Sequence, residues 1–81
     1  MKAPRDIRGE ELAKLLGRYG YRVTRRTGSH IRLTTTEQGE HHVTIPLHNP
    51  LRIGTLNNIL NDIAAHLRIS KEALSKELFI R

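Results

Sequence analysis

The sequence contains no cysteine and no tryptophan, and only Tyr19, Tyr21 and Phe79 are aromatic among its 81 residues. Without cysteine the chain has no disulfide framework and no thiolate metal site. Surfaces that stack single-stranded bases need exposed aromatic side chains, so this type of nucleic-acid binder is disfavoured. No apolar run approaches the roughly 20 residues that cross a bilayer, and the polar N-terminus does not resemble a signal peptide. We therefore expect a cytoplasmic protein without a membrane partner.

Acidic side chains are also absent between Glu11 and Glu37. The basic residues of this window are Lys14, Arg18, Arg22, Arg25, Arg26 and Arg32. Over the whole chain, 14 Lys and Arg residues outnumber 8 Asp and Glu residues, which gives a formal net charge of +6. A segregated basic block favours a polyanionic partner, nucleic acid before a membrane surface. The alternative is a basic face that is merely solvated.

Hydrophobic periodicity predicts the order α-β-β-β-α with an extra C-terminal helix, in one domain spanning residues 1–81. The first helix begins at Gly9, and Gly20 is placed for a left-handed cap. Thr55 and Ser70 are the expected N-caps of the later helices. The helix positions expected to be buried are Leu12, Leu15, Leu16, Tyr19, Leu56, Ile59, Leu60, Ile63, Leu67, Leu74 and Leu78. The simplest fold that buries them is α+β, an antiparallel sheet with helices on one face, as in the double-stranded RNA-binding domain.

Alternating residue types predict three strands, over residues 21–27, 30–36 and 41–46. The first is expected to be half-buried, with one face formed by Tyr21, Val23 and Arg25 and the other by Arg22, Thr24 and Arg26. The inward residues of the other strands are Ile31, Leu33, Val43 and Ile45, and the outward ones are His30, Arg32, Thr34, His42 and Thr44. This period of two predicts that His30 lies beside Arg32 on an open sheet surface.

Gly28, Ser29 and His30 form a turn between two strands and are flanked by arginines. RNA is cut without metal when a base takes the 2′-hydroxyl proton, the oxygen attacks phosphorus, and an acid protonates the leaving 5′-oxygen. Histidine can serve either step near neutral pH, and arginines can hold the phosphate and stabilise its developing charge. The alternative is that Gly28 only makes the hairpin turn and that His30 is an ordinary exposed residue.

The other histidines carry weaker signals. His48 follows the third strand and is the leading candidate for a second proton carrier or phosphate donor, against a solvated loop histidine. His41 and His42 are neighbours on a strand and point to opposite faces, so they cannot chelate one ion. His66 is expected at the edge of the core. Without cysteine or a helical histidine pair four residues apart, the sequence predicts no metal site.

Several short motifs recur in a characteristic order over about residues 9–70. They are the segments 11–16, 20–21, 25–26, 28–30, 43–48, 54–56 and 59–60. In this order they resemble the HicA toxin family, also called the YcfA-like family. The resemblance implies a toxin of a type II toxin–antitoxin pair with a double-stranded-RNA-binding-domain-like fold. It also implies messenger-RNA cleavage without metal or cofactor, with His30 as the catalytic residue and a HicB-like antitoxin that masks it.

The sequence therefore predicts an endoribonuclease with His30 as the catalytic residue. The expected RNA contacts are Arg25, Arg26, Gly28, Ser29, Arg32 and His48. One alternative is a non-catalytic RNA-binding module that uses the same basic face, and another is a protein whose basic face binds an acidic protein. Residues 70–81 extend beyond many members of the family, and a role in folding, dimerisation or antitoxin docking stays open. The expected oligomeric state is a monomer or a weak dimer.

Overall fold

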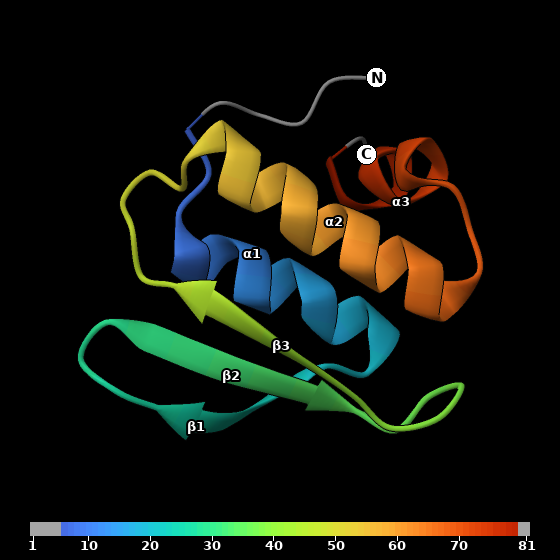
Figure 1. The fold of residues 1–81 in the computed structure, drawn as a ribbon, viewed down its shortest axis with the longest axis horizontal. Coiled ribbons are helices and arrows are strands. Elements are labelled where there is room, and N and C mark those ends of the chain that lie inside the picture. Colours follow the sequence, from blue (N-terminus) through green and yellow to red (C-terminus); the bar gives the residue numbers. More distant parts are fainter. Residues whose placement is uncertain (1–5, 80–81) are drawn as a thin grey trace.

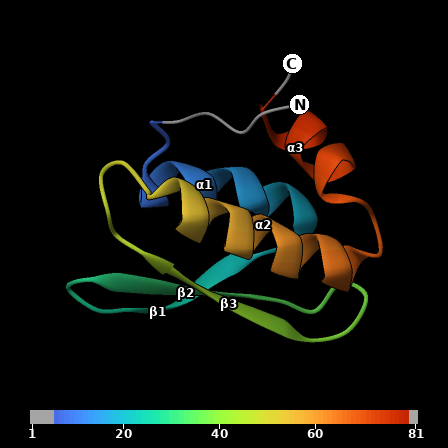
Figure 2. The same ribbon diagram turned by 45° about the horizontal axis from the view of Figure 1, so that its top comes forward.

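The computed structural model of the protein describes residues 6–79, in which three α-helices lie on one side of a three-stranded sheet (Figures 1 and 2). The elements are α1 (Gly9–Leu16), a 3-10 turn η1 (Gly17–Tyr19), β1 (Arg22–Arg26), β2 (His30–Thr35), β3 (His41–Pro46), α2 (Ile53–Leu67) and α3 (Lys71–Phe79). The sheet is antiparallel with the order β1-β2-β3. This arrangement confirms the predicted α+β fold and the extra C-terminal helix.

One hydrophobic core lies between the inner face of the sheet and the helices. Ile31 and Leu33 of β2 and Val43 and Ile45 of β3 are at most 5% exposed, which confirms the predicted inward positions. The helix positions predicted to be buried are also buried, except that Leu15 and Tyr19 are only partly covered. Burying one such Leu or Ile side chain contributes roughly 1.5–3 kcal/mol relative to leaving it exposed. The core therefore fixes which face of the sheet remains open.

Helix ends follow the sequence signals in two places and depart from them in a third. Gly20 adopts φ +80° in the left-handed region, and the Ala73 N–H donates to Ser70 Oγ at 2.9 Å, so both predicted caps are confirmed. The prediction that Thr55 is the N-cap of α2 is wrong, because the N-cap is Arg52. Leu51 is 2% exposed and its N–H donates to the Ile7 carbonyl at 2.8 Å. This buried anchor positions the chain so that the helix starts directly after it.

The first strand differs most from the prediction. All five residues of β1 are exposed, Val23 among them at 45%, so the expectation of a half-buried strand is wrong. A register shift between Val23 and Arg25 makes Thr24 the extra residue of a β-bulge. β1 is an edge strand, and Tyr21, which precedes it, supplies the buried side chain instead. The simple alternation predicted for residues 21–27 is broken at the bulge.

Within residues 6–79, no helix is long and apolar enough to cross a membrane.

Candidate functional site

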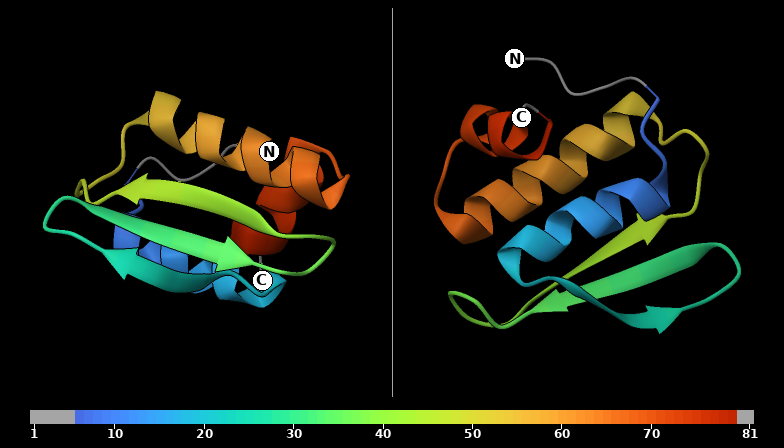
Figure 3. Two further views of the ribbon diagram at one scale, coloured as in Figure 1. Left: turned by 60° about the horizontal axis from the view of Figure 1, so that its bottom comes forward. Right: turned by 180° about the vertical axis from the view of Figure 1, so that it is seen from behind.

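No helix covers the sheet face turned away from α1, α2 and α3, as Figure 3 (left) shows. The cross-strand pairs on this face are His30 with Pro46, Arg32 with Thr44 and Thr34 with His42. Paired residues of antiparallel strands place their side chains on the same face. The predicted outward positions of the second and third strands are therefore confirmed.

His30 is the first residue of β2, and its position is set by a tight turn. The Thr27 N–H donates to the His30 carbonyl at 2.9 Å, and the His30 N–H donates to Thr27 Oγ1 at 3.1 Å. The Leu47 N–H donates to the Ser29 carbonyl at 2.8 Å and ties the turn to the end of β3. Ser29 Oγ lies 2.8 Å from His30 Nδ1. This contact orients the ring, and no residue from 6 to 79 hydrogen-bonds its Nε2 atom.

A hollow of about 340 Å³ adjoins His30, and we call it the His30 hollow. It is lined by Arg25, Thr27, His30, Arg32, His42 and Thr44. Its volume is close to the lower end of the range for small-molecule sites, roughly 300–1,000 Å³. Two guanidinium groups and two imidazoles thus border one open hollow, a suitable environment for a phosphodiester.

The bulge in β1 decides which of two neighbouring arginines lines this hollow. Beyond Thr24, Arg25 pairs with Arg32 on the open face, whereas Arg26 pairs with the buried Ile31. The sequence had grouped Arg25 with Val23 instead. A one-residue insertion reverses the faces of all later side chains in a strand. The structure therefore brings Arg25, but not Arg26, to His30.

Arg26 instead contacts Glu10 of α1 on the helix side of the sheet. Its Nη1 and Nη2 atoms donate to the two Glu10 carboxylate oxygens at 2.7 and 3.3 Å. This hydrogen bonding lowers the pKa of Glu10 and raises that of Arg26. Both side chains are more than half exposed, so the pair is screened by solvent.

His48 and Gly28, two further predicted contacts, lie outside the His30 hollow. His48 borders a separate hollow of about 360 Å³ beside the first turn of α1, and its carbonyl accepts the Gly9 N–H at 3.4 Å. The structure does not place it next to His30 as a second proton carrier. Gly28 has no positive φ, and a Cβ at this position would meet nothing within 4 Å. Its surroundings leave the turn accessible.

Two histidines lie away from the open face: His41 of β3 points toward α2, and His66 belongs to α2. Tyr21 Oη lies 2.7 Å from His41 Nδ1, and His41 Nε2 lies 3.2 Å from Asp62 Oδ1 of α2. The His41 ring stacks on His66, with ring centroids 4.4 Å apart and planes at 10°. Burial, followed by the nearby Asp62 charge, raises the pKa of Tyr21 to about 12. Because His41 of β3 contacts both Asp62 and His66 of α2, the cluster links these two elements.

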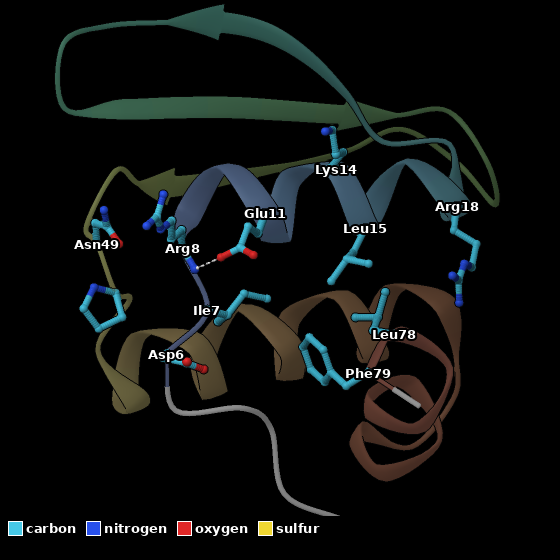
Figure 4. A pocket seen from close by; sticks show the side chains of 11 residues that line it. Asp6, Ile7, Arg8, Glu11, Lys14, Leu15, Arg18, Asn49, Leu78 and Phe79 are labelled. Carbon is cyan, nitrogen blue, oxygen red and sulfur yellow. Dashed lines mark hydrogen bonds between the residues drawn. The ribbon is translucent and has the colours of Figure 1, made fainter. Parts of the chain in front are cut away.

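A larger groove of about 960 Å³ lies between α1 and α3 (Figure 4). Its apolar side chains include Ile7, Leu15 and Phe79. The Glu11 carboxylate accepts the Arg8 N–H at 2.9 Å, and Arg18 donates to the Glu77 carbonyl. The groove contains no histidine, so it does not compete with the His30 hollow as a site for proton transfer.

No group of three or more His, Asp or Glu side chains in the described part of the chain is placed to hold a metal ion.

A family model described as HicA toxin of bacterial toxin-antitoxin matches residues 9–64, more than half of the chain. The chain belongs to the HicA toxin family. Membership supports a toxin role, a pairing with an antitoxin and, at the level of reaction class, a nuclease. The segment matched by the HicA model includes all residues that line the His30 hollow, whereas α3 lies beyond it. Searches of curated proteins and of solved structures gave no significant match.

Three residues that line the His30 hollow were not among the predicted contacts of this HicA-family chain. They are Thr27, His42 and Thr44. The strand alternation had already placed His42 and Thr44 on the face of His30, so a signal was present. Thr27 was not recognisable, because its contacts depend on the geometry of the turn.

Proposed function

We propose that this HicA-family toxin is an endoribonuclease that cleaves messenger RNA without a metal ion and that His30 is a catalytic residue. The observation that carries the proposal is the position of His30 on the open face. Ser29 orients its ring through Nδ1, and Arg25 and Arg32 border the same hollow. An imidazole beside two guanidinium groups matches the needs of phosphodiester cleavage.

The chemistry requires a phosphodiester in the His30 hollow, with its non-bridging oxygens held by Arg25 and Arg32. Guanidinium groups bind such oxygens through charge-assisted hydrogen bonds and stabilise the extra charge of the transition state. The 2′-oxygen attacks phosphorus, and the bond from phosphorus to the 5′-oxygen breaks. His30 either removes the 2′-hydroxyl proton or protonates the 5′-oxygen.

The surface around His30 favours contacts with the RNA backbone over base stacking. Tyr21 is 2% exposed, and Tyr19 and Phe79 pack against the core, so no tyrosine or phenylalanine ring lies on the open face. The net charge of +6 and the acid-free window supply attraction to phosphate. We therefore infer that the protein contacts phosphate and ribose rather than reading bases by stacking.

The same face is the natural target for the antitoxin. A HicB-like protein that places acidic side chains against Arg25 and Arg32 would cover His30 and exclude RNA at the same time. Opposite charges across an interface also accelerate association. RNA and antitoxin are therefore expected to compete for binding.

The test is RNA cleavage by purified protein in the presence of a chelator, comparing wild type with His30→Ala. We expect the variant to lose at least about 100-fold in rate, as for other general acid–base residues, while it stays folded and binds RNA. Lys76→Ala changes an exposed residue of α3, a helix that lies away from the sheet (Figure 1). It is the control and should cleave normally. Cleavage by His30→Ala at the wild-type rate would contradict the assignment. Salt-sensitive binding without any cleavage by wild type would instead support a non-catalytic RNA-binding module.

A further inference from the structure

The His30 hollow is bordered by a second imidazole, that of His42. His30 lies at the start of β2, and His42 lies on β3 opposite Thr34. The pair Arg32 and Thr44 lies between them in the ladder. The two histidines therefore border one hollow of about 340 Å³ from positions two cross-strand pairs apart, and Arg32 lines the same hollow.

Both nitrogens of the His42 ring have partners. Nε2 lies 2.7 Å from Glu40 Oε2, and Nδ1 lies 2.7 Å from Thr34 Oγ1. Thr34 Oγ1 in turn lies 2.9 Å from Thr24 Oγ1. An ionised carboxylate only accepts hydrogen bonds, so the proton between His42 and Glu40 belongs to Nε2. In neutral His42, Nδ1 then carries a lone pair and accepts the Thr34 hydroxyl.

This order of groups, carboxylate to imidazole to hydroxyl, is the arrangement of a general base. The carboxylate selects the tautomer and stabilises the imidazolium that forms when the ring takes a proton. Thr34 Oγ1 shows that a hydroxyl can approach Nδ1 at 2.7 Å. A ribose 2′-hydroxyl that enters the hollow can make the same contact in its place.

The remaining histidines do not border the His30 hollow. His41 is held between Tyr21 and Asp62 on the helix side, and His66 stacks on it. His48 borders the hollow beside α1. Of the five histidines, all within the described residues, His42 is the one that shares a hollow with His30.

We propose that His42, held by Glu40, is the general base of the reaction and that His30 is the general acid; this assignment rests on the proposed function. His42 Nδ1 removes the 2′-hydroxyl proton while the 2′-oxygen forms its bond to phosphorus. The bond from phosphorus to the 5′-oxygen breaks, and that oxygen receives the proton of His30 Nε2. The products are a 2′,3′-cyclic phosphate and a 5′-hydroxyl end. Glu40 is a positioning residue that acts through His42.

The test uses two RNA substrates, one natural and one in which sulfur replaces the bridging 5′-oxygen. A thiolate leaves without protonation, so the sulfur substrate needs a base but no acid. We expect His30→Ala to lose at least about 100-fold on the natural substrate and to recover near wild-type rates on the sulfur substrate. His42→Ala should reduce the cleavage rate by a similar factor on both the natural and the sulfur substrate. His42→Asn, which keeps a hydrogen-bonding side chain without a proton-carrying ring, should behave like His42→Ala.

Glu40→Gln separates positioning from a structural role. Without the carboxylate, the imidazolium that forms in the transition state is less stabilised. We therefore expect kcat to fall at least about tenfold, whereas KM, which reports RNA binding by the arginines, should change little. The matched control is Asp62→Asn, which alters the equivalent carboxylate–histidine pair on the helix side. Its kcat and KM should match those of wild type.

The outcomes distinguish this inference from the proposed function. If wild type cleaves neither substrate, both the proposed function and the role of His42 are overturned. If wild type cleaves RNA, His30→Ala is inactive and the two His42 variants cleave normally, only the role of His42 is overturned. Recovery of the His42 variants, but not of His30→Ala, on the sulfur substrate would also overturn the assignment, because it would make His42 the acid. A kcat for Glu40→Gln equal to that of wild type would overturn the role of Glu40.

Discussion

His41 and His42 are adjacent residues of β3, and the pleat of the strand directs their side chains to opposite faces of the sheet. Each imidazole lies near a carboxylate and a hydroxyl: His41 near Asp62 and Tyr21, and His42 near Glu40 and Thr34. The His41 side chain is 18% exposed and that of His42 is 37% exposed.

The two clusters thus contain similar groups in different settings. Around His41, the Tyr21 side chain is buried and the cluster joins β3 to α2. Around His42, the ring borders a solvent-open hollow that it shares with His30. The type of residue therefore does not by itself separate a structural histidine from a candidate reactive one. Access to a ligand, set by the face of the sheet, makes the difference.

The largest expected difference between the two faces is in the loss of stability when neighbouring residues of β2 are replaced by Ala. Leu33 is fully buried, so Leu33→Ala should reduce the free energy of unfolding by about 2–5 kcal/mol. Arg32, its neighbour on the open face, should tolerate Ala with little loss of stability. Urea unfolding followed by circular dichroism measures both variants. Similar losses for the two changes would mean that the faces are not as distinct as described.

The second largest difference is expected between the losses of stability caused by replacing His41 and by replacing His42. His41→Ala leaves the buried Tyr21 hydroxyl without its partner, which should cost about 1–3 kcal/mol of stability. His42→Ala removes contacts on an exposed face and should cost clearly less. The same unfolding experiment compares the two. A larger loss for His42→Ala would indicate that its network is mainly a structural link between strands.

Stability at alkaline pH depends on the tyrosines of the helix side and not on the His30 hollow. The pKa of Tyr21 is raised to about 12 by burial and by Asp62, and that of Tyr19 to about 12 by burial and by Glu77. An unfolded tyrosine titrates near pH 10, so the unfolded chain loses these protons first. The contribution of these two tyrosines to the free energy of unfolding should therefore be fully present below about pH 10. It should be lost as the pH rises toward about 12. Urea unfolding of wild type and Tyr21→Phe at a series of pH values checks this, and the variant should show a shallower decline.

The smallest expected effect concerns the two arginines around the bulge. Arg25→Ala should weaken RNA binding several-fold and lower the slope of log affinity against log salt by about 1, because one phosphate contact is lost. Arg26→Ala should change binding little, since Arg26 faces Glu10. Fluorescence anisotropy with labelled RNA, both changes being made in the His30→Ala background, measures the difference. Stronger weakening by Arg26→Ala would show that β1 lacks the bulge when RNA is bound.

Local sequence patterns predicted β2 and β3 and the faces of their side chains. Each strand places two aliphatic side chains on one face, Ile31 and Leu33 or Val43 and Ile45. A one-residue slip would expose them, so the buried face fixes the register. The same logic predicted the open position of His30, and Ser70 was recognisable as a cap because its hydroxyl acts within its own helix.

The register of β1 could not be predicted in this way, because both faces of the strand are exposed. With no buried side to specify register, the bulge at Thr24 depends on how the edge strand pairs with β2 and on the contact between Arg26 and Glu10, 16 residues apart. Likewise, the start of α2 depends on the burial of Leu51. Contacts between residues far apart in the sequence produce no periodic pattern that could be recognised in it.

The sequence by itself thus determined the order of elements, the buried stripes and the open, basic setting of His30, because these follow from local periodicity and composition. Only the tertiary structure decided which residues join His30. Strand pairing placed Arg25 rather than Arg26 at the His30 hollow, left His48 beside α1, and set His42 across the ladder. The physical reason is that a site on a sheet is assembled across strands, whereas sequence patterns describe one strand at a time.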